Sequence, residues 1–125
     1  MSYLRSNYML ETARRKLKEK GFQESEEIKN TPSSSTIDLI ASNVEENRHL
    51  IFEFKRGPIS TLDVARFHAS ISDVRLPGEK FAFIVTDAPY TASAESLSKK
   101  LKISLIKTDE KTVKQTMDNI FIEEQ

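Results

Sequence analysis

An acid and an amine stand two residues apart in an apolar stretch of the chain, at Glu53 and Lys55. If this stretch is a strand, Glu53 and Lys55 point to the same face, about 7 Å apart, because side chains alternate along a strand. Phe52 and Phe54 then point to the other face, into a core. Charges on so hydrophobic a strand are costly to bury unless they are paired or hold a metal ion. With Asp38 upstream, these groups suit metal-dependent cleavage of a phosphodiester bond.

Two neighbouring strands are needed to position these groups. Residues 36–42 and 49–55 are rich in β-branched and apolar side chains, which predicts strands, and the polar residues 43–48 predict a hairpin loop between them. Asp38 precedes this turn by about as many residues as Glu53 follows it. We therefore expect the two carboxylates to meet at the end of the sheet away from the turn, where they could share one metal ion.

The remaining segments alternate between helical and extended patterns. The order is α-β-β-β-α-β-α-β followed by a C-terminal helix, which indicates an α/β fold with a mixed sheet and helices on both faces. The almost wholly apolar run at 81–85 is typical of a central strand covered on both sides. The predicted helices are 7–20, 62–74, 92–101 and 109–122, and the further strands are 22–28, 81–85 and 103–106.

Length and composition indicate an ordinary globular protein. We expect one domain over residues 1–125, with a core at about 7–106 and the helix 109–122 outside the core pattern. Lysines and arginines number 19 and acids 19, so the net charge is zero, which counts mildly against nucleic-acid binding. No apolar run approaches a membrane span and no signal-peptide core is present, which predicts a cytoplasmic protein without membrane contact.

The residue types available limit the kind of metal site. The chain has no cysteine and only two histidines, His49 and His68, so neither a thiolate site nor a histidine-based zinc site is expected. A metal would be a hard cation on oxygen ligands, Mg²⁺ or Mn²⁺. The sequence also lacks a P-loop, a dinucleotide fingerprint and a nucleophile elbow, which argues against an enzyme that acts on small molecules, and no organic cofactor is expected.

Four stretches carry a resemblance to a known family. They are the helix with Leu-Glu-Thr-Ala at 10–13 that ends in Gly-Phe at 21–22, Ile-Asp-Leu-Ile at 37–40, Phe-Glu-Phe-Lys at 52–55, and the ending at 81–94 and 103–106. Their order and spacing resemble the PD-(D/E)xK nuclease superfamily, which has the restriction-endonuclease-like fold. Within it the chain looks most like the Mrr-type restriction endonucleases and the archaeal Holliday-junction resolvases.

The resemblance implies roles for particular residues. Asp38 and Glu53 would bind Mg²⁺ or Mn²⁺ together with the backbone carbonyl of Phe54. Lys55 would orient or deprotonate the attacking water, or stabilise charge on the phosphate. Glu11 matches a helix-one glutamate that reaches toward the metal or its waters. Further residues implied as nucleic-acid contacts are Arg56, Arg66 and His68.

Each of these residues also has a structural interpretation. Glu53 and Lys55 could simply form an ion pair, and Glu11 could pair with Arg15 one helical turn away. Asp38 could cap a turn, although apolar neighbours on both sides make that harder to explain. Arg66 and His68 could be surface residues of a helix.

Two functions from different classes remain after this comparison. The first is a metal-dependent DNA endonuclease acting on branched or duplex DNA, as a homodimer formed through the helix at 109–122. The second is a catalytically inactive member of the fold that binds nucleic acid or another protein. Metal binding that depends on Asp38 and Glu53 distinguishes the first from the second.

Overall fold

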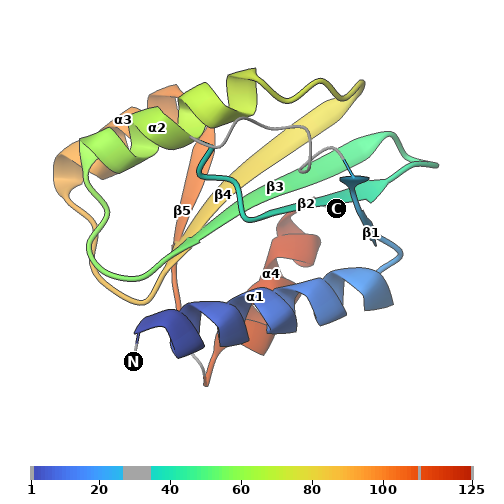
Figure 1. Cartoon of the computed structure of the whole chain (residues 1–125), viewed down its shortest axis with the longest axis horizontal. Coiled ribbons are helices and arrows are strands. Elements are labelled where there is room, and N and C mark those ends of the chain that lie inside the picture. Colours follow the sequence, from blue (N-terminus) through green and yellow to red (C-terminus); the bar gives the residue numbers. More distant parts are fainter. Residues whose placement is uncertain (1, 27–34, 110, 125) are drawn as a thin grey trace.

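A mixed five-stranded sheet forms the middle layer of the molecule, with helices on both of its faces (Figure 1). The computed structural model describes residues 2–26, 35–109 and 111–124. Helices and strands follow one another in the predicted order, so the α/β fold class is confirmed. Part of the predicted first strand and of the loop after it, residues 27–34, lies outside the described residues.

The sheet has the strand order β1-β2-β3-β4-β5. β1, β2 and β3 pair antiparallel, and β3, β4 and β5 pair parallel, so the sheet changes from a meander to crossover connections at β3. Leu39 pairs with Phe52 in the predicted β2–β3 hairpin. The strands are β1 Gln23–Glu24, β2 Leu39–Asn43, β3 Arg48–Lys55, β4 Glu79–Thr86 and β5 Ile103–Lys107.

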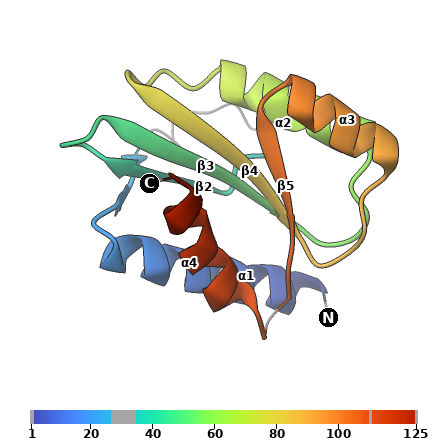
Figure 2. The same ribbon diagram turned by 180° about the vertical axis from the view of Figure 1, so that it is seen from behind.

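The four helices divide between the two faces, as Figures 1 and 2 show from opposite sides. α1 (Ser2–Glu19) and α4 (Val113–Glu124) cover one face, and α2 (Thr61–Ser72) and α3 (Ala92–Lys100) cover the other. Within the described residues, no helix is both long and apolar enough to cross a membrane.

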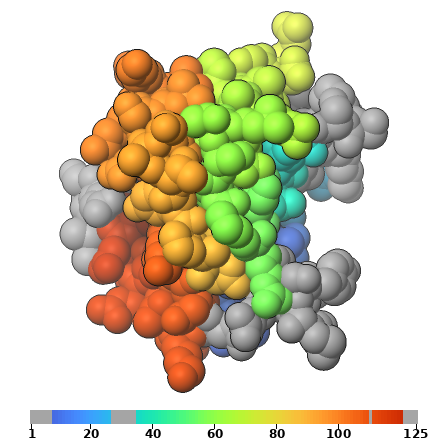
Figure 3. All heavy atoms as spheres, turned by 90° about the vertical axis from the view of Figure 1, so that its left-hand side faces the viewer, coloured from blue at the N-terminus to red at the C-terminus, as the bar shows by residue number. Residues whose placement is uncertain are grey.

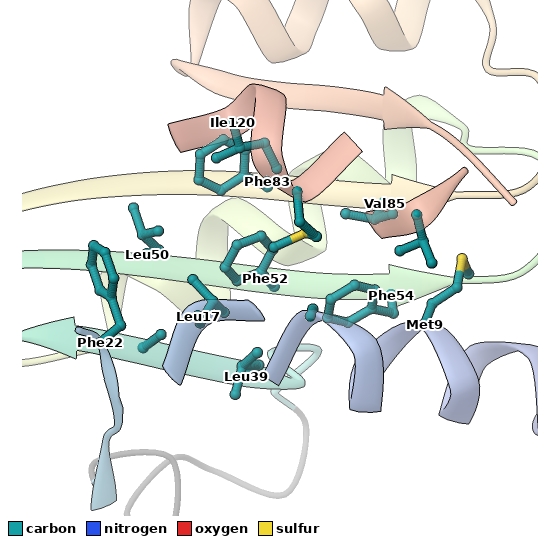
Figure 4. Packing of buried hydrophobic residues seen from close by; sticks show 14 residues of the cluster. Met9, Leu17, Phe22, Leu39, Leu50, Phe52, Phe54, Phe83, Val85 and Ile120 are labelled. Atoms are coloured by element: carbon teal, nitrogen blue, oxygen red, sulfur yellow. The ribbon is translucent and has the colours of Figure 1, made fainter. Parts of the chain in front are cut away.

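The core under α1 and α4 is built around the phenylalanines of β3 (Figure 4). The Phe52 ring stacks on Phe54 with centroids 5.7 Å apart and on Phe83 at 5.0 Å. α4 belongs to this core, because Val113 and Met117 are fully buried in it. The expectation that the C-terminal helix lies outside the core pattern is therefore wrong, since Ile120 is buried in the same core as well.

A second core lies under α2 and α3. Val64 and Phe67 of α2 are fully buried against Ile51 of β3 and Ile84 of β4, as the apolar spacing of the predicted helix requires. The N-cap of α2 is Ser60. Its hydroxyl accepts the backbone N–H three residues on, which is the standard way to satisfy a first-turn donor.

Candidate active site

The two faces of β3 carry different chemistry. Phe52 and Phe54 are buried on the α1–α4 side, and the residues between and after them, Glu53 and Lys55, project toward the α2–α3 side. Glu53 and Lys55 are only partly buried, whereas Ile51 before them on the same face is fully buried. The alternation predicted for this strand therefore holds, and the charged residues occupy its carboxyl end.

Asp38 is fastened to β3 although it precedes the first residue of β2. Its backbone N–H donates to the carbonyl of Phe52 at 2.8 Å, and its Oδ2 accepts the N–H of Phe54 at 2.7 Å. The residue keeps a solvent-exposed surface. Burial of the carboxyl by surrounding protein raises the pKa of Asp38, and the Phe54 N–H opposes this shift. The hairpin thus places Asp38 beside Glu53, as its spacing predicts.

The carboxyl group of Glu53 lies in an unfavourable environment. Its Oε1 is buried and has no hydrogen-bond partner within the described part of the chain. Burial and the negative charge of Asp38 raise the pKa of Glu53 from 4.5 to about 7, while a hydrogen bond with the Thr36 side chain and the charge of Lys55 act in the opposite direction. A buried carboxylate oxygen with no partner is costly, so this arrangement favours binding of a proton or a cation.

Lys55 pairs with Asp63 of α2, not with Glu53. The ion pair between Glu53 and Lys55 that the sequence allows is therefore not formed. Burial acts to raise the pKa of Asp63, but hydrogen bonds from Lys55 and from Ser60 outweigh it, and the pKa lies below its ordinary value. Sequence reasoning missed Asp63. The available signal was the pattern of Ser60 followed three residues later by an acid, which the structure forms as a capping box.

Glu11 is not brought to this cluster. It forms an ion pair with Arg14, rather than with the expected Arg15, and Arg14 also binds Glu24 of β1 at 2.9 Å. The side chain is 52% exposed on α1, the helix that covers the opposite face of the sheet from Glu53. A catalytic role for Glu11 stays a prediction.

The segments after β3 and β4 run side by side at the end of the sheet that Figure 3 faces, in green and in yellow to orange. Asp87 joins them, because it accepts the N–H of Gly57 at 3.2 Å and lies 3.5 Å from Arg56. Arg66 and His68 are exposed on α2. Of the three predicted nucleic-acid contacts, Arg56 is thus the one already engaged with an acid.

The side chains present fit a hard divalent cation. Glu53 contributes a buried oxygen without a partner, and Asp38 contributes a second carboxylate next to it. In the described residues no group of three or more His, Cys, Asp or Glu side chains could hold a metal. A cation here would therefore rest on the two carboxylates, a backbone carbonyl and water, which is a ligand set that Mg²⁺ tolerates.

Comparison with known proteins tests the fold. No family model matches the sequence, and no curated protein matches it. Among solved structures, a protein of unknown function, AF1548, superposes with a TM-score of 0.56 at 17% identity, over 78% of this chain and 56% of that one. A repair endonuclease from Pyrococcus abyssi superposes with a TM-score of 0.51 at 18% identity, over 75% of this chain and 41% of that one. The chain has a restriction-endonuclease-like fold.

A third solved structure is the MspJI restriction endonuclease in complex with a 27-mer oligonucleotide, with a TM-score of 0.49, 17% identity and coverage of 94% of this chain and 31% of that one. In each comparison the chain spans well under two thirds of the other protein's length, from 31% to 56%. At these identities the likeness concerns the fold, and the activity has to be argued from the site.

Proposed function

We propose that the protein is a metal-dependent DNA endonuclease that hydrolyses phosphodiester bonds. The observation that carries the proposal is the partnerless buried Oε1 of Glu53, beside a second carboxylate, Asp38. Two neighbouring carboxylates with raised pKa values disfavour each other's charged form. A bound divalent cation would neutralise both charges, so the pair is well suited to bind one. The endonuclease-like fold supports this interpretation.

Three protein groups would hold Mg²⁺ or Mn²⁺: the carboxylates of Asp38 and Glu53, and the backbone carbonyl of Phe54. When bound, the cation lowers the pKa of a coordinated water and neutralises charge that develops on the phosphate. The Lys55 ammonium stands on the same face of β3 as Glu53, and its positive charge reaches that carboxylate. An ammonium has three N–H donors, so one bond to Asp63 leaves two for the attacking water or a phosphate oxygen.

DNA is the proposed substrate. One structural neighbour is a repair endonuclease, and the sequence resembles the Mrr-type endonucleases and the Holliday-junction resolvases. Arg66 and His68 are exposed on α2, whose first turn contacts Lys55, and they are the proposed contacts of a backbone phosphate. The homodimer and the cytoplasmic location stay predictions, and Val113, Met117 and Ile120 of α4 are buried in the core and so do not form a dimer surface.

A binding module without catalysis is the second candidate. It is favoured by the pairing of both basic residues at the end of β3, Lys55 with Asp63 and Arg56 with Asp87, which lowers the positive charge offered to a phosphate. The zero net charge of the chain points the same way. Such a module has no reason to bind a divalent cation through Asp38 and Glu53.

A cleavage panel tests the proposal. Linear, nicked, flapped and four-way DNA are incubated with the protein and Mg²⁺ or Mn²⁺, alongside Asp38→Ala, Lys55→Ala and the control Asp73→Ala, which alters the exposed C-cap residue of α2. We expect cation-dependent cleavage of at least one substrate by the wild type and by Asp73→Ala, and none by Asp38→Ala. Cleavage that persists in folded Asp38→Ala and Lys55→Ala would show that the site is wrongly assigned.

A further inference from the structure

α2 makes polar contacts with the candidate site and with the segment before Asp38, and both come from one side of the helix. Near its start, Asp63 pairs with Lys55. Two turns later, the hydroxyl of Ser70 accepts the backbone N–H of Thr36 at 3.0 Å, and Thr36 lies close enough to Glu53 for its side chain to oppose the rise in the pKa of that residue. Residues seven apart on a helix lie on the same side, about 10 Å along the axis. The helix is therefore tied directly to the lysine of the site, and to the segment that leads into Asp38.

Asp63 itself is held by the start of the helix. Its Oδ2 accepts the backbone N–H of Ser60 at 2.8 Å and the Ser60 hydroxyl at 3.0 Å, and its Oδ1 takes the Lys55 ammonium. The side chain is only 13% exposed. Val64, the next residue, is fully buried in the core under α2. Both carboxylate oxygens of Asp63 are thus engaged in hydrogen bonds.

The side chain of Lys55, in contrast, is flexible and partly exposed. It is 34% exposed, and its four-carbon stem has several rotamers of similar energy. An unanchored ammonium at this position would spend much of its time in solvent, because charged groups are best hydrated there. One bond to a fixed carboxylate removes that freedom and leaves two donors available.

We propose that Asp63 is a positioning residue that acts through Lys55, holding the ammonium beside Glu53 where it can meet a phosphate oxygen or the attacking water. This inference rests on the proposed nuclease function for its catalytic consequence. The Lys55–Asp63 contact itself can be tested without any activity, so that the two can fail separately.

The activity test uses Asp63→Asn, Asp63→Glu and a matched control, Asp109→Asn. Asparagine keeps an oxygen for the Ser60 N–H but loses the charge that holds Lys55. Asp109 also accepts backbone N–H groups in a helix-initiating turn, from Lys111 at 2.9 Å and Thr112 at 3.0 Å, but it precedes α4 on the other face. We expect Asp63→Asn to lower kcat about 10- to 100-fold with KM changed less than about threefold, Asp63→Glu to recover part of the loss, and Asp109→Asn to match the wild type.

A double substitution separates positioning from a general loss of structure. If Asp63 acts through Lys55, Asp63→Asn adds no further loss of kcat in the Lys55→Ala background, since residues that act as a unit are non-additive. A further loss of the same size as in the wild-type background overturns the proposal. An Asp63→Asn variant with wild-type kcat overturns it as well.

The contact is checked independently by NMR of protein labelled with ¹⁵N at the lysine side chains, with the Lys55 signal identified by its loss in Lys55→Arg. We expect a slowly exchanging Lys55 ammonium in the wild type and in Asp109→Asn, and its disappearance in Asp63→Asn. A wild-type protein without that signal overturns the proposal. If the signal is present but no DNA is cleaved, the positioning contact stands and the nuclease function fails.

Discussion

Asp38 accepts the backbone N–H of Phe54 through Oδ2 at 2.7 Å, which fastens its carboxylate to the strand that carries Glu53. This hydrogen bond does not fully offset the effect of burial, because the pKa of Asp38 remains above its ordinary value. Its charge in turn helps to raise the pKa of Glu53. The backbone therefore holds the carboxyl groups of Asp38 and Glu53 close together, although this disfavours their charged forms. This proximity determines the behaviour expected of the metal-free protein.

The first prediction concerns stability and pH in the presence of a chelator. The pKa of Glu53 is raised from 4.5 to about 7 in the folded chain. The folded protein then binds more protons than the unfolded chain between these values, so the free energy of unfolding falls as the pH rises through that window and stays lower above it. At about pH 8 we expect Glu53→Gln to be more stable than the wild type by about 2 kcal/mol, less than the full shift implies because Glu53 is only partly buried.

Urea unfolding at several pH values checks this prediction. The two proteins should differ little at about pH 4, below both pKa values, and should separate as the pH rises. Equal stability at high pH would mean that Glu53 ionises in the folded protein without penalty. Glu95→Gln is a matched control, since Glu95 is exposed on α3 and should show no such separation.

The second prediction separates Lys55 from the metal ligands. Lys55→Ala removes the ammonium but neither carboxylate, so the variant should bind Mn²⁺ about as well as the wild type. Cleavage should fall by about 10²- to 10⁴-fold, the usual contribution of a positioned proton donor or acceptor. Calorimetry and a cleavage time course measure the two quantities. A joint loss of metal binding and cleavage would instead make Lys55 a structural support of the carboxylates.

The third prediction compares the two histidines. His49 is buried, with Nδ1 2.7 Å from the Ser42 hydroxyl and Nε2 2.6 Å from the carbonyl of Pro77, to which it donates. His49→Ala leaves a cavity and removes both bonds, so it should lower the free energy of unfolding by about 2–4 kcal/mol. His68→Ala, at an exposed position of α2, should change it by less than about 0.5 kcal/mol. Denaturant unfolding of the two variants measures these changes. A similar loss of stability in both would contradict a structural role for His49 and a surface position for His68.

Local patterns were enough to predict the fold and the pairing of the two acids. Alternation along a strand fixes which residues share a face, so Phe52 and Phe54 were correctly assigned to the core and Glu53 and Lys55 to the other side. In an antiparallel hairpin, spacing from the turn fixes which residues face one another. That is why the proximity of Asp38 to Glu53 could be read from the sequence.

Contacts between elements distant in the chain could not be predicted in this way. Arg14 and Arg15 are both within one turn of Glu11, and Arg14 is the one that also reaches Glu24 on β1. Lys55 meets Asp63 because the loop after β3 returns α2 over the sheet. An amphipathic pattern likewise shows which side of α4 is apolar but not that Val113, Met117 and Ile120 pack into the core under α1.

Titration calorimetry with Mn²⁺ tests the central claim most directly, because it asks whether Asp38 and Glu53 hold a cation before any substrate is chosen. The proteins compared are the wild type, Asp38→Asn, Glu53→Gln and the surface control Glu95→Gln. We predict one Mn²⁺ site in the wild type and in Glu95→Gln, weakened at least about tenfold in Asp38→Asn and in Glu53→Gln. Absence of Mn²⁺ binding by the folded wild type, or binding unchanged in both site variants, would contradict the account.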